Sequence, residues 1–465
     1  MTPTRRLLLI LLPSLAAAAL PGAAAASPHP VARASYVPGE VIVRYERSAD
    51  RAARAAVQRQ TGVGRPRVFA PRTRALTIRD GQSVTGTLRE LRARPEVATA
   101  APNTVARVSA FIPTDPGRAG VPGGWQQLQW NFLADTGVNA PDAWQRLIDV
   151  GRTGGSGVTV AVLDTGVAYS DRGRCPRSAG SSSRRTVTCR RSPDFRTGDF
   201  VAGYDFVDGD SRPNDENGHG THVAGTIGEG TDDDIGVTGL AYGARIMPVR
   251  VLDRIGEGDS VAISSGIRWA ARHRANVINL SFEFGPHVTS SEIPDILAAL
   301  RYARRKNVLV VGASGNAAAR SVAYPARATD VLSVGATTQH LCVAEYSNNG
   351  ANLDIVAPGG GEDAAIRGDA ACRPTDQPGG NIYQMTFDGS TRRFGLPGEY
   401  MGTSMAAPHV SAAAALVIAS GVIGPRPTPA AVEARLKATA RDLGPGGPDA
   451  RYGAGLLDAA RAVTP

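Results

Sequence analysis

The sequence predicts an α/β protein in which a doubly wound, mostly parallel sheet carries helices on both faces, preceded by a small α+β unit. Two observations support this prediction. From Trp125 onward, short apolar runs alternate with segments of helical periodicity, the pattern of buried parallel strands joined by crossover helices. Before residue 109, a shorter rhythm of strands and helices occupies a segment of its own.

The larger unit contains five apolar runs that we expect to be strands: 158–163, 246–252, 277–280, 308–311 and 331–334. Residues 260–274 and 291–305 lie between them and have helical periodicity. In open sheets of this kind, ligands bind at the carboxyl ends of the strands. Polar residues that directly follow an apolar run are therefore candidates for a functional site.

The smaller unit covers residues 36–108 and is predicted to alternate strands with helices. We expect strand at 41–45, around Val68, at 75–78 and within 97–108, with helices at 49–60 and 84–92. Residues 111–124 are rich in proline and glycine, and we expect them to form an exposed linker.

The first 26 residues resemble a secretory signal peptide. Arg5 and Arg6 are followed by an apolar run at 7–20 and by small residues at 23–26, so cleavage is expected near Ala26. No later stretch is predicted to span a membrane, because residues 406–419 are too short and include polar side chains.

The net charge of +9 is unevenly distributed. Residues 1–109 contain 17 arginines and 6 acidic residues, whereas the rest of the chain has a net charge of −2. No basic stripe with interleaved aromatic residues is present in the larger unit, so a nucleic-acid partner is not expected.

The four cysteines can pair in three ways. We favour the two local disulfides, Cys175–Cys189 and Cys342–Cys372, because export permits disulfides and each would staple a polar loop. Free thiols are the alternative.

Three polar residues have the chemistry of nucleophilic catalysis. Asp164 ends an apolar run, His219 lies between glycines, and Ser404 precedes a long run of small residues that predicts a buried helix. Taken singly, the aspartate could start a turn, the serine could be a plain helix N-cap, and His219 with His222 could bind a metal. Together they supply a nucleophile, its general base and a carboxylate that orients the base.

The segments around these residues are Asp164-Thr-Gly, His219-Gly-Thr-His and Gly402-Thr-Ser-Met-Ala-Ala-Pro. They resemble the three signatures of the subtilisin-like serine proteases, in that family's chain order, and the likeness runs from about Gln129 to Leu457. The resemblance implies a secreted, extracellular serine endopeptidase with a subtilisin-like fold. It also implies that Asn316, in Gly-Ala-Ser-Gly-Asn, joins the Ser404 backbone N–H in the oxyanion hole.

The same resemblance implies two segments that bind substrate backbone. One is 252–258, with Gly256 and Gly258, and the other contains Ser281 and Phe282. Here the chain departs from the family pattern, because Glu283 stands beside the primary specificity pocket where glycine is usual. One hypothesis is that Glu283 attracts a basic substrate side chain; the alternative is a solvated carboxylate.

Structural calcium is also implied by the resemblance. The expected ligands of a first site are Gln129, Asp194, Thr231, Asp233, Ile235 and Val237, and those of a second, weaker site are Asp205, Asp208, Asp210 and Asn214. The alternative is that both are acidic surface loops.

By the same resemblance, residues 27–110 form a ferredoxin-like propeptide that assists folding and inhibits the peptidase domain at 125–465. We expect self-cleavage between about Val108 and Gly124. An ordinary accessory domain is the alternative for the small unit. For the whole chain, the rivals are an inactive peptide-binding homologue and a serine carboxyl protease, against which His219 argues. The expected partners are polypeptide substrates and the propeptide, and the mature enzyme is expected to be a monomer.

Overall fold

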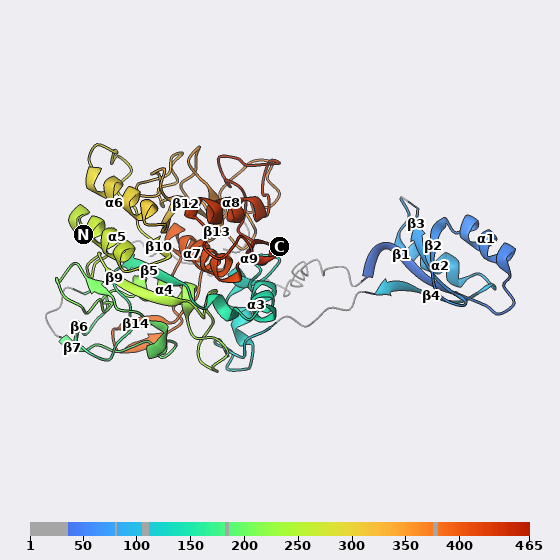
Figure 1. Cartoon of the computed structure of the whole chain (residues 1–465), viewed down its shortest axis with the longest axis horizontal. Helices are drawn as coiled ribbons and strands as arrows, with labels where there is room; N and C mark the ends of the chain where they lie inside the picture. The colour runs from blue at the N-terminus through green and yellow to red at the C-terminus, as the bar shows by residue number, and fades with distance from the viewer. Residues whose placement is uncertain (1–35, 80, 105–110, 182–185, 375–379) are drawn as a thin grey trace, which may run out of the picture. The chain divides into compact units, whose positions relative to one another are not determined.

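The computed structural model describes residues 36–79, 81–104, 111–181, 186–374 and 380–465, so the expected signal peptide lies outside the described residues. The chain divides into two compact units, with the boundary between Val108 and Ser109 (Figure 1). Each unit has its own hydrophobic core, and each is described by itself.

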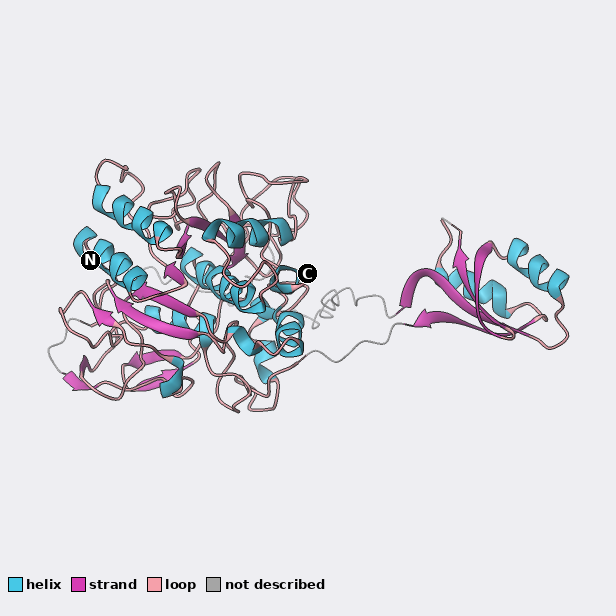
Figure 2. Cartoon of the chain, in the orientation of Figure 1, coloured by secondary structure: helices cyan, strands magenta, loops and turns pink. Residues whose placement is uncertain are grey.

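The N-terminal unit is a four-stranded antiparallel sheet with two helices (Figure 2). Its elements are β1 (Tyr36–Tyr45), α1 (Arg51–Gln60), β2 (Val63–Ala70), β3 (Thr73–Ile78), α2 (Val84–Arg92) and β4 (Val97–Thr104). The strand order β2-β3-β1-β4 is the ferredoxin-like order that was expected. Asp50 and Ser83 cap the two helices through their side chains, which explains where both helices begin.

A seven-stranded sheet forms the centre of the larger unit, with the strand order β13-β12-β11-β10-β5-β9-β8 and all pairs parallel. The strands are β5 (Thr159–Asp164), β8 (Tyr204–Asp205), β9 (Arg245–Arg250), β10 (Val277–Leu280), β11 (Leu309–Ala313), β12 (Leu332–Thr337) and β13 (Ile355–Pro358). The five predicted strands are confirmed; β8 and β13, at the two edges, were not predicted.

Helices cover both faces of this sheet, as its buried strands require. On β5, Val160 and Val162 face the core shared with α4 (His219–Gly228) and α7 (Thr403–Ser420). Ala161 and Leu163 face the opposite core, with α5 (Ser260–Arg272) and α6 (Pro294–Arg305). The doubly wound arrangement is therefore confirmed. The remaining helices are α3 (Ala140–Asp149), α8 (Pro429–Thr439) and α9 (Ala459–Val463), with short 3-10 turns at Gly124–Gln127, Trp130–Phe132, Thr153–Gly155 and Thr197–Asp199.

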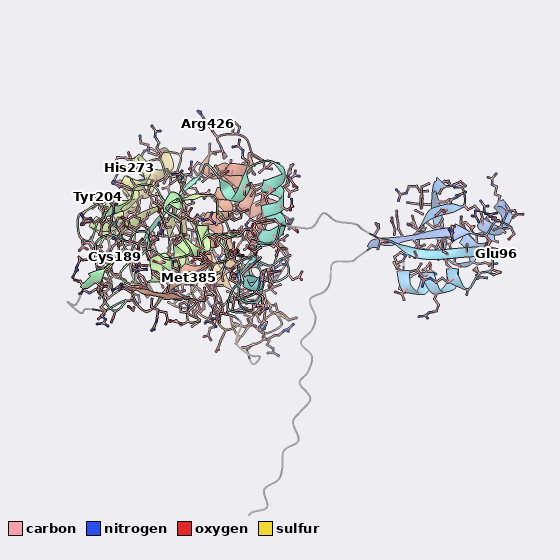
Figure 3. All side chains as sticks on the ribbon, turned by 90° about the horizontal axis from the view of Figure 1, so that it is seen from below. Glu96, Cys189, Tyr204, His273, Met385 and Arg426 are labelled. Carbon is pink, nitrogen blue, oxygen red and sulfur yellow. A yellow bond between two sulfur atoms is a disulfide. The ribbon has the colours of Figure 1, made fainter. Side chains whose placement is uncertain are left out.

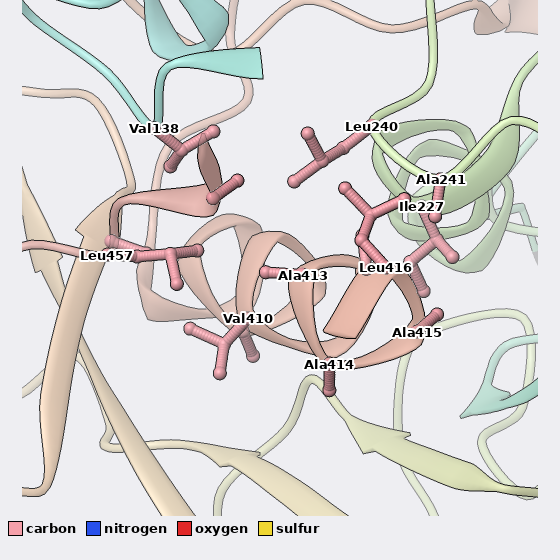
Figure 4. Packing of buried hydrophobic residues seen from close by; sticks show 14 of the residues in the cluster. Val138, Ile227, Leu240, Ala241, Val410, Ala413, Ala414, Ala415, Leu416 and Leu457 are labelled. Carbon is pink, nitrogen blue, oxygen red and sulfur yellow. The ribbon is translucent and has the colours of Figure 1, made fainter. Parts of the chain in front are cut away.

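Helix α7 lies inside the core. In Figure 4, Leu416 points toward Ile227, Leu240 and Ala241, while the alanines at 413–415 let neighbouring elements approach closely. In the part of the chain that the structure describes, α7 is the one helix long and apolar enough to cross a membrane, and 78% of it is buried in the protein. Its composition is thus that of a core helix.

Both predicted disulfides, Cys175–Cys189 and Cys342–Cys372, are present (Cys189 is labelled in Figure 3). The first staples the ribbon formed by β6 (Arg174–Pro176) and β7 (Thr186–Thr188). A second ribbon, β14 (Thr386–Ser390) with β15 (Arg393–Gly395), meets it: the Thr391 hydroxyl donates to the Pro176 carbonyl at 2.6 Å.

Residues 111–124, which were expected to form an exposed linker, are exposed at 118–122 but packed toward both ends. These residues belong to the larger unit, where Phe111 packs edge-on against Trp144 at 6.4 Å. The Trp125 indole donates to the Pro113 carbonyl at 3.0 Å, and Asp115 is fully buried. Proline and glycine here form tight turns against the protein rather than a free tether.

Candidate active site

Asp164 and His219 are brought together at the carboxyl edge of the sheet. Asp164 is the last residue of β5, and His219 is the first residue of α4, which follows Gly218 in the left-handed region at φ 114°. His219 Nδ1 lies 2.7 Å from Asp164 Oδ1. Because the buried carboxylate can only accept, Nδ1 carries the proton and Nε2 is left as the basic nitrogen.

The electrostatics of this pair suit a general base. Burial lowers the pKa of His219, but the charge of Asp164 and its hydrogen bond outweigh burial, so the pKa is raised above its ordinary value. Asp164 is fully buried, whereas the His219 side chain is 26% exposed. The imidazole can therefore reach a substrate while its partner carboxylate cannot.

A second carboxylate, Asp215, fixes this geometry and was not predicted from the sequence. One of its oxygens accepts from the Thr165 hydroxyl at 2.9 Å and from the Gly218 N–H at 3.0 Å. The other accepts from the N–H and hydroxyl of Thr221, at 2.9 and 2.6 Å. Asp215 therefore ties the end of β5 to the first turn of α4. Only its position shortly before the Asn-Gly-His segment could have signalled a helix-capping role.

Ser404 is the second residue of α7, at a helix N-terminus, as expected. Pro408 follows four residues later and has no N–H, so the Ser404 carbonyl lacks its usual helical donor. The Ser281 hydroxyl supplies that hydrogen bond at 2.8 Å, and the Ser404 hydroxyl in turn donates to the Ser281 carbonyl at 2.9 Å. The hydroxyl of each serine thus donates to the carbonyl of the other. To attack a substrate, the Ser404 hydroxyl must rotate away from the Ser281 carbonyl.

The segments that carry His219 and Ser404 are packed together. The ring of His222, one turn along α4, stacks on Tyr400 at 4.1 Å, and the Thr386 hydroxyl donates to the Gly218 carbonyl at 2.6 Å. His222 Nε2 donates to the Ile382 carbonyl at 3.0 Å, and burial lowers the pKa of His222 to about 3. His222 is therefore neutral and supports the packing, and the pair His219–His222 has separate partners rather than a shared metal.

Asn316 lies just beyond β11, and its side-chain amide has a fixed orientation. Its Oδ1 accepts from the Thr403 N–H at 2.8 Å and from the Thr403 hydroxyl at 2.9 Å, which leaves Nδ2 as a free donor. Gly402 keeps the adjacent space open: a Cβ there would lie 3.7 Å from both Asn316 Nδ2 and the Ser404 N–H. The two expected oxyanion donors are thus neighbours beside an open position.

The predicted substrate-binding segments differ in how they are held. Residues 252–258 form a tight turn in which the Asp253 N–H donates to the Glu257 carbonyl at 2.7 Å. Gly256 stands at φ +87° over open space, whereas a side chain at Gly258 would clash with the Val251 carbonyl. In the second segment, Ser281 is buried and Phe282 packs on the core, while the Glu283 carboxylate accepts from the Asn316 N–H at 2.9 Å.

Around the first predicted calcium site, Gln129 and Asp115 both hydrogen-bond to backbone groups of residues 232–238. Gln129 does so through its amide, accepting from the Thr238 N–H at 3.0 Å and donating to the Thr238 carbonyl at 2.8 Å. Asp115, which the sequence analysis placed in a linker, instead accepts from the N–H groups of Asp232 and Asp233 at 3.0 and 3.1 Å. Asp115 therefore belongs to the acidic loop that Thr231, Asp233, Ile235 and Val237 were expected to form.

The carboxylates of this loop are only partly compensated, by the ion pair of Arg196 with Asp233 at 3.1 Å. Burial raises the pKa of Asp115 to about 6, and burial together with Asp233 and Asp115 raises that of Asp194 well above its usual range. Asp194 Oδ1 is buried without a hydrogen-bond partner among the described residues, and so is one oxygen of Glu229, whose other oxygen accepts from the Met385 N–H (Met385 is labelled in Figure 3). No three such side chains among the described residues converge closely enough to ligate a metal without adjustment. The unpartnered oxygens of Asp194 and Glu229 nevertheless fit a hard cation.

The second predicted calcium cluster already contains a cation from the protein. The Arg250 guanidinium donates to Asp205 at 3.0 Å, to Asp208 at 2.8 Å and to Glu216 at 3.0 Å. Asp210 accepts from the Arg212 N–H, and the Asn214 amide donates to the Arg172 carbonyl. An ion here would have to share its carboxylates with Arg250. This role of Arg250 could not be predicted from the sequence, because Arg250 lies on β9, far along the chain.

The fold and site define a hydrolase with a serine, a histidine and a buried aspartate at the carboxyl edge of a parallel sheet. Comparison with known proteins gives the family: residues 155–455 match the Subtilase family, Peptidase S8, and residues 22–103 match the fervidolysin N-terminal prodomain. The chain belongs to the subtilase family of serine proteases and carries a propeptide domain.

Individual relatives agree with this assignment. The chain is 36% identical to Subtilisin Savinase of Lederbergia lenta over 338 residues, which cover 73% of this chain and 99% of that protein. It is 34% identical to an extracellular protease of Xanthomonas campestris pv. campestris over 353 residues, covering 72% of this chain and 55% of that protein. A solved protease from Pseudoalteromonas arctica superposes with a TM-score of 0.55 at 29% identity, covering 76% of this chain and 99% of that one.

Proposed function

We propose that this subtilase is a secreted endopeptidase that hydrolyses peptide bonds through an acyl-enzyme on Ser404. The observation that carries the proposal is the His219–Asp164 hydrogen bond of 2.7 Å, which leaves Nε2 of a pKa-raised imidazole as the base. The Asn316 amide, held by Thr403 beside the Ser404 N–H, supplies the electrostatic part of the site.

In the proposed mechanism, His219 Nε2 takes the Ser404 proton as the hydroxyl oxygen attacks the substrate carbonyl. The oxyanion receives hydrogen bonds from Asn316 Nδ2 and the Ser404 N–H, while Asp164 stabilises the imidazolium. His219 then gives its proton to the leaving amine, and the peptide bond breaks to form the acyl-enzyme. Water, deprotonated by the same imidazole, attacks the ester and restores Ser404.

Labelling with phenylmethylsulfonyl fluoride tests this function. We expect a single sulfonyl adduct on Ser404, found by peptide mass spectrometry, with loss of activity in proportion to labelling. The Ser404→Ala variant should be neither labelled nor active. A wild-type protein that binds peptides but neither reacts nor cleaves would instead be the inactive peptide-binding homologue.

We further propose that the protein is made as a zymogen whose residues 27–110 inhibit the peptidase unit until they are cut away. The prodomain match over residues 22–103 and the ferredoxin-like order of the small unit support this. Because residues 111–124 pack on the peptidase unit, we place the cut before Phe111. Secretion is supported by the name of the Xanthomonas relative, and we propose that the mature enzyme is a monomer.

We also propose that the peptidase unit binds structural calcium at the acidic loop. Asp115, Asp194 and Asp233 would hold the ion by their side chains, with backbone carbonyls of Thr231, Ile235 and Val237 as expected from the family resemblance. The unpartnered Asp194 oxygen supports this, because a buried carboxylate oxygen without a donor is costly. Bound calcium would neutralise the loop and join residues 111–117 to it.

A further inference from the structure

Glu283 has a partner inside the protein that a glycine at this position could not have. Its half-buried carboxylate accepts a hydrogen bond from the backbone N–H of Asn316 at 2.9 Å through Oε1. The second oxygen lies against Gly315, where any Cβ would clash with it. The carboxylate therefore covers the backbone of Gly315 and Asn316. Asn316 carries the side-chain amide that is expected in the oxyanion hole.

The loop that carries Asn316 is held from the other side by Asn348. The Asn348 Oδ1 accepts from the N–H groups of Ala317 and Ala319 at 3.0 and 2.9 Å. The backbone N–H of Asn348 donates to the Gly315 carbonyl at 2.9 Å. Gly315 has φ +107°, and a Cβ there would also clash with the Asn348 amide. The backbone of Gly315 thus passes between the side chains of Glu283 and Asn348, which only glycine allows.

Asn316 is consequently fixed at two points by two different elements. Thr403, on α7, holds the side-chain carbonyl oxygen, and Glu283, just beyond β10, holds the backbone N–H. A donor in a catalytic site must be held to within about 0.5 Å of its productive position. A hydrogen bond to an ionised acceptor is stronger than one between neutral groups, so a carboxylate suits this task.

We propose that Glu283 is a positioning residue, whose carboxylate fixes the Asn316 backbone so that Asn316 Nδ2 is aligned with the oxyanion. This inference rests on the proposed function, because it assigns Asn316 to the oxyanion hole. Glu283 acts on the transition state through Asn316 and does not itself touch the reacting atoms. Its role therefore competes with the hypothesis that Glu283 attracts a basic substrate side chain, and the same variants separate the two.

The test compares Glu283→Gln, which keeps an acceptor oxygen, with Glu283→Met, which keeps the length of the side chain without an acceptor. We expect Glu283→Met to lower kcat by about 10-fold with KM nearly unchanged, a fraction of the roughly 100- to 1,000-fold loss measured on removing the corresponding amide of subtilisin. A peptide aldehyde, which forms an oxyanion on Ser404, should bind the Met variant more weakly in the same proportion. A product peptide, which forms none, should bind equally well.

Rescue and matched controls complete the design. Glu283→Gln should retain kcat within about 3-fold of wild type, because its amide oxygen can still accept from the Asn316 N–H. Asp295→Ala removes an exposed carboxylate in the first turn of α6 and should change neither kcat nor aldehyde binding. All rates are divided by the concentration of sulfonyl-titrated sites, so that loss of folded protein does not imitate loss of kcat.

Two results would overturn the proposal. One is a Met variant with wild-type kcat and wild-type aldehyde affinity. The other is a Gln variant that selectively loses cleavage after arginine relative to phenylalanine. That result would show that the negative charge of Glu283 attracts the basic side chain of the substrate. Should Glu283→Met fail to fold, Glu283→Ala takes its place. Its kcat and aldehyde affinity, and the arginine preference of Glu283→Gln, then decide the question. If wild-type protein itself is inert to the sulfonyl fluoride, the proposed function fails rather than the role of Glu283.

Discussion

The carboxylate of Asp115 accepts a hydrogen bond of 3.1 Å from the backbone N–H of Asp233, a residue 118 positions further along the chain. This contact anchors the first residues of the peptidase unit to its acidic loop. It also gathers negative charge that Arg196 neutralises only in part: burial, with Asp233 and Asp115 nearby, raises the pKa of Asp194. The relationship has consequences for both metal dependence and processing.

We predict that EDTA lowers the melting temperature of the sulfonyl-inhibited mature protein and that calcium restores it. An ion at 100 times its Kd stabilises by about 2.7 kcal/mol, which corresponds to a shift of several degrees for a unit of this size. Asp115→Asn should abolish most of the EDTA effect, whereas Gln129→Glu should not. An unchanged melting curve in EDTA would exclude a stabilising calcium ion.

N-terminal sequencing should show that the mature protein begins at or before Phe111. A cut further along would release Phe111 from Trp144 and, beyond residue 115, remove a carboxylate of the acidic loop. Ser404→Ala, purified from a protease-free host, should keep residues 27–110. Loss of that segment from the Ala variant would show that the cut is made by another protease.

The acid limb of kcat/KM should have its midpoint above pH 6.5, the ordinary pKa of histidine, because the pKa of His219 is raised. Below this pKa the imidazolium cannot accept the Ser404 proton, so activity falls as the pH falls. In Asp164→Asn the main influences that raise this pKa are lost, and the midpoint should move to lower pH. Its kcat should fall by about 10,000-fold. If the acid limb of kcat/KM had the same midpoint in the wild type and in Asp164→Asn, a group other than His219 would be titrating.

Ser281→Ala should destabilise the inhibited protein by about 1–3 kcal/mol, because the Ser404 carbonyl loses its donor. Pro408→Ala restores an N–H four residues after Ser404, which is the donor that the helix normally supplies. The double variant should therefore be less destabilised than the sum of the two single variants, by about 1 kcal/mol. Chemical denaturation of sulfonyl-inhibited samples measures this without autolysis. If the effects of the two single variants simply add, the N–H restored by Pro408→Ala does not replace the Ser281 hydroxyl as the donor to the Ser404 carbonyl.

Local patterns were sufficient to predict most of the fold. The runs that became β5, β10 and β11 are continuous apolar stretches followed by polar residues, so their type and approximate bounds follow from burial on both faces. The strand β8 has two residues and leaves no pattern to detect, and β13 is not distinguished from the loops around it. The packing at the two ends of residues 111–124 could not be predicted, because proline and glycine favour tight packed turns as well as tethers.

The site was predictable only where its residues lie in contiguous motifs. His219, Ser404 and Asn316 each lie in a distinctive segment, whereas the roles of Asp215 and Asp115 depend on contacts with residues far along the chain, Thr165 and Asp233. These contacts join residues 50 and 118 positions apart, so no local spacing reveals them. Glu283 was noticed as unusual, but its partner could not be inferred, because the direction of a side chain near a loop depends on the folded backbone.

The two ribbons that meet through Thr391 and Pro176 also touch the segments that carry the histidine, since Thr386 donates to the Gly218 carbonyl. Because they contact each other, the ribbons β6–β7 and β14–β15 form one structural module from two segments that are distant in the sequence. A chimaera whose replacement for the Cys175–Cys189 loop follows a different backbone path would displace the carbonyl that accepts from the Thr391 hydroxyl. Grafting, trimming or recombination in this region should therefore move both ribbons together, with crossover points outside the pair.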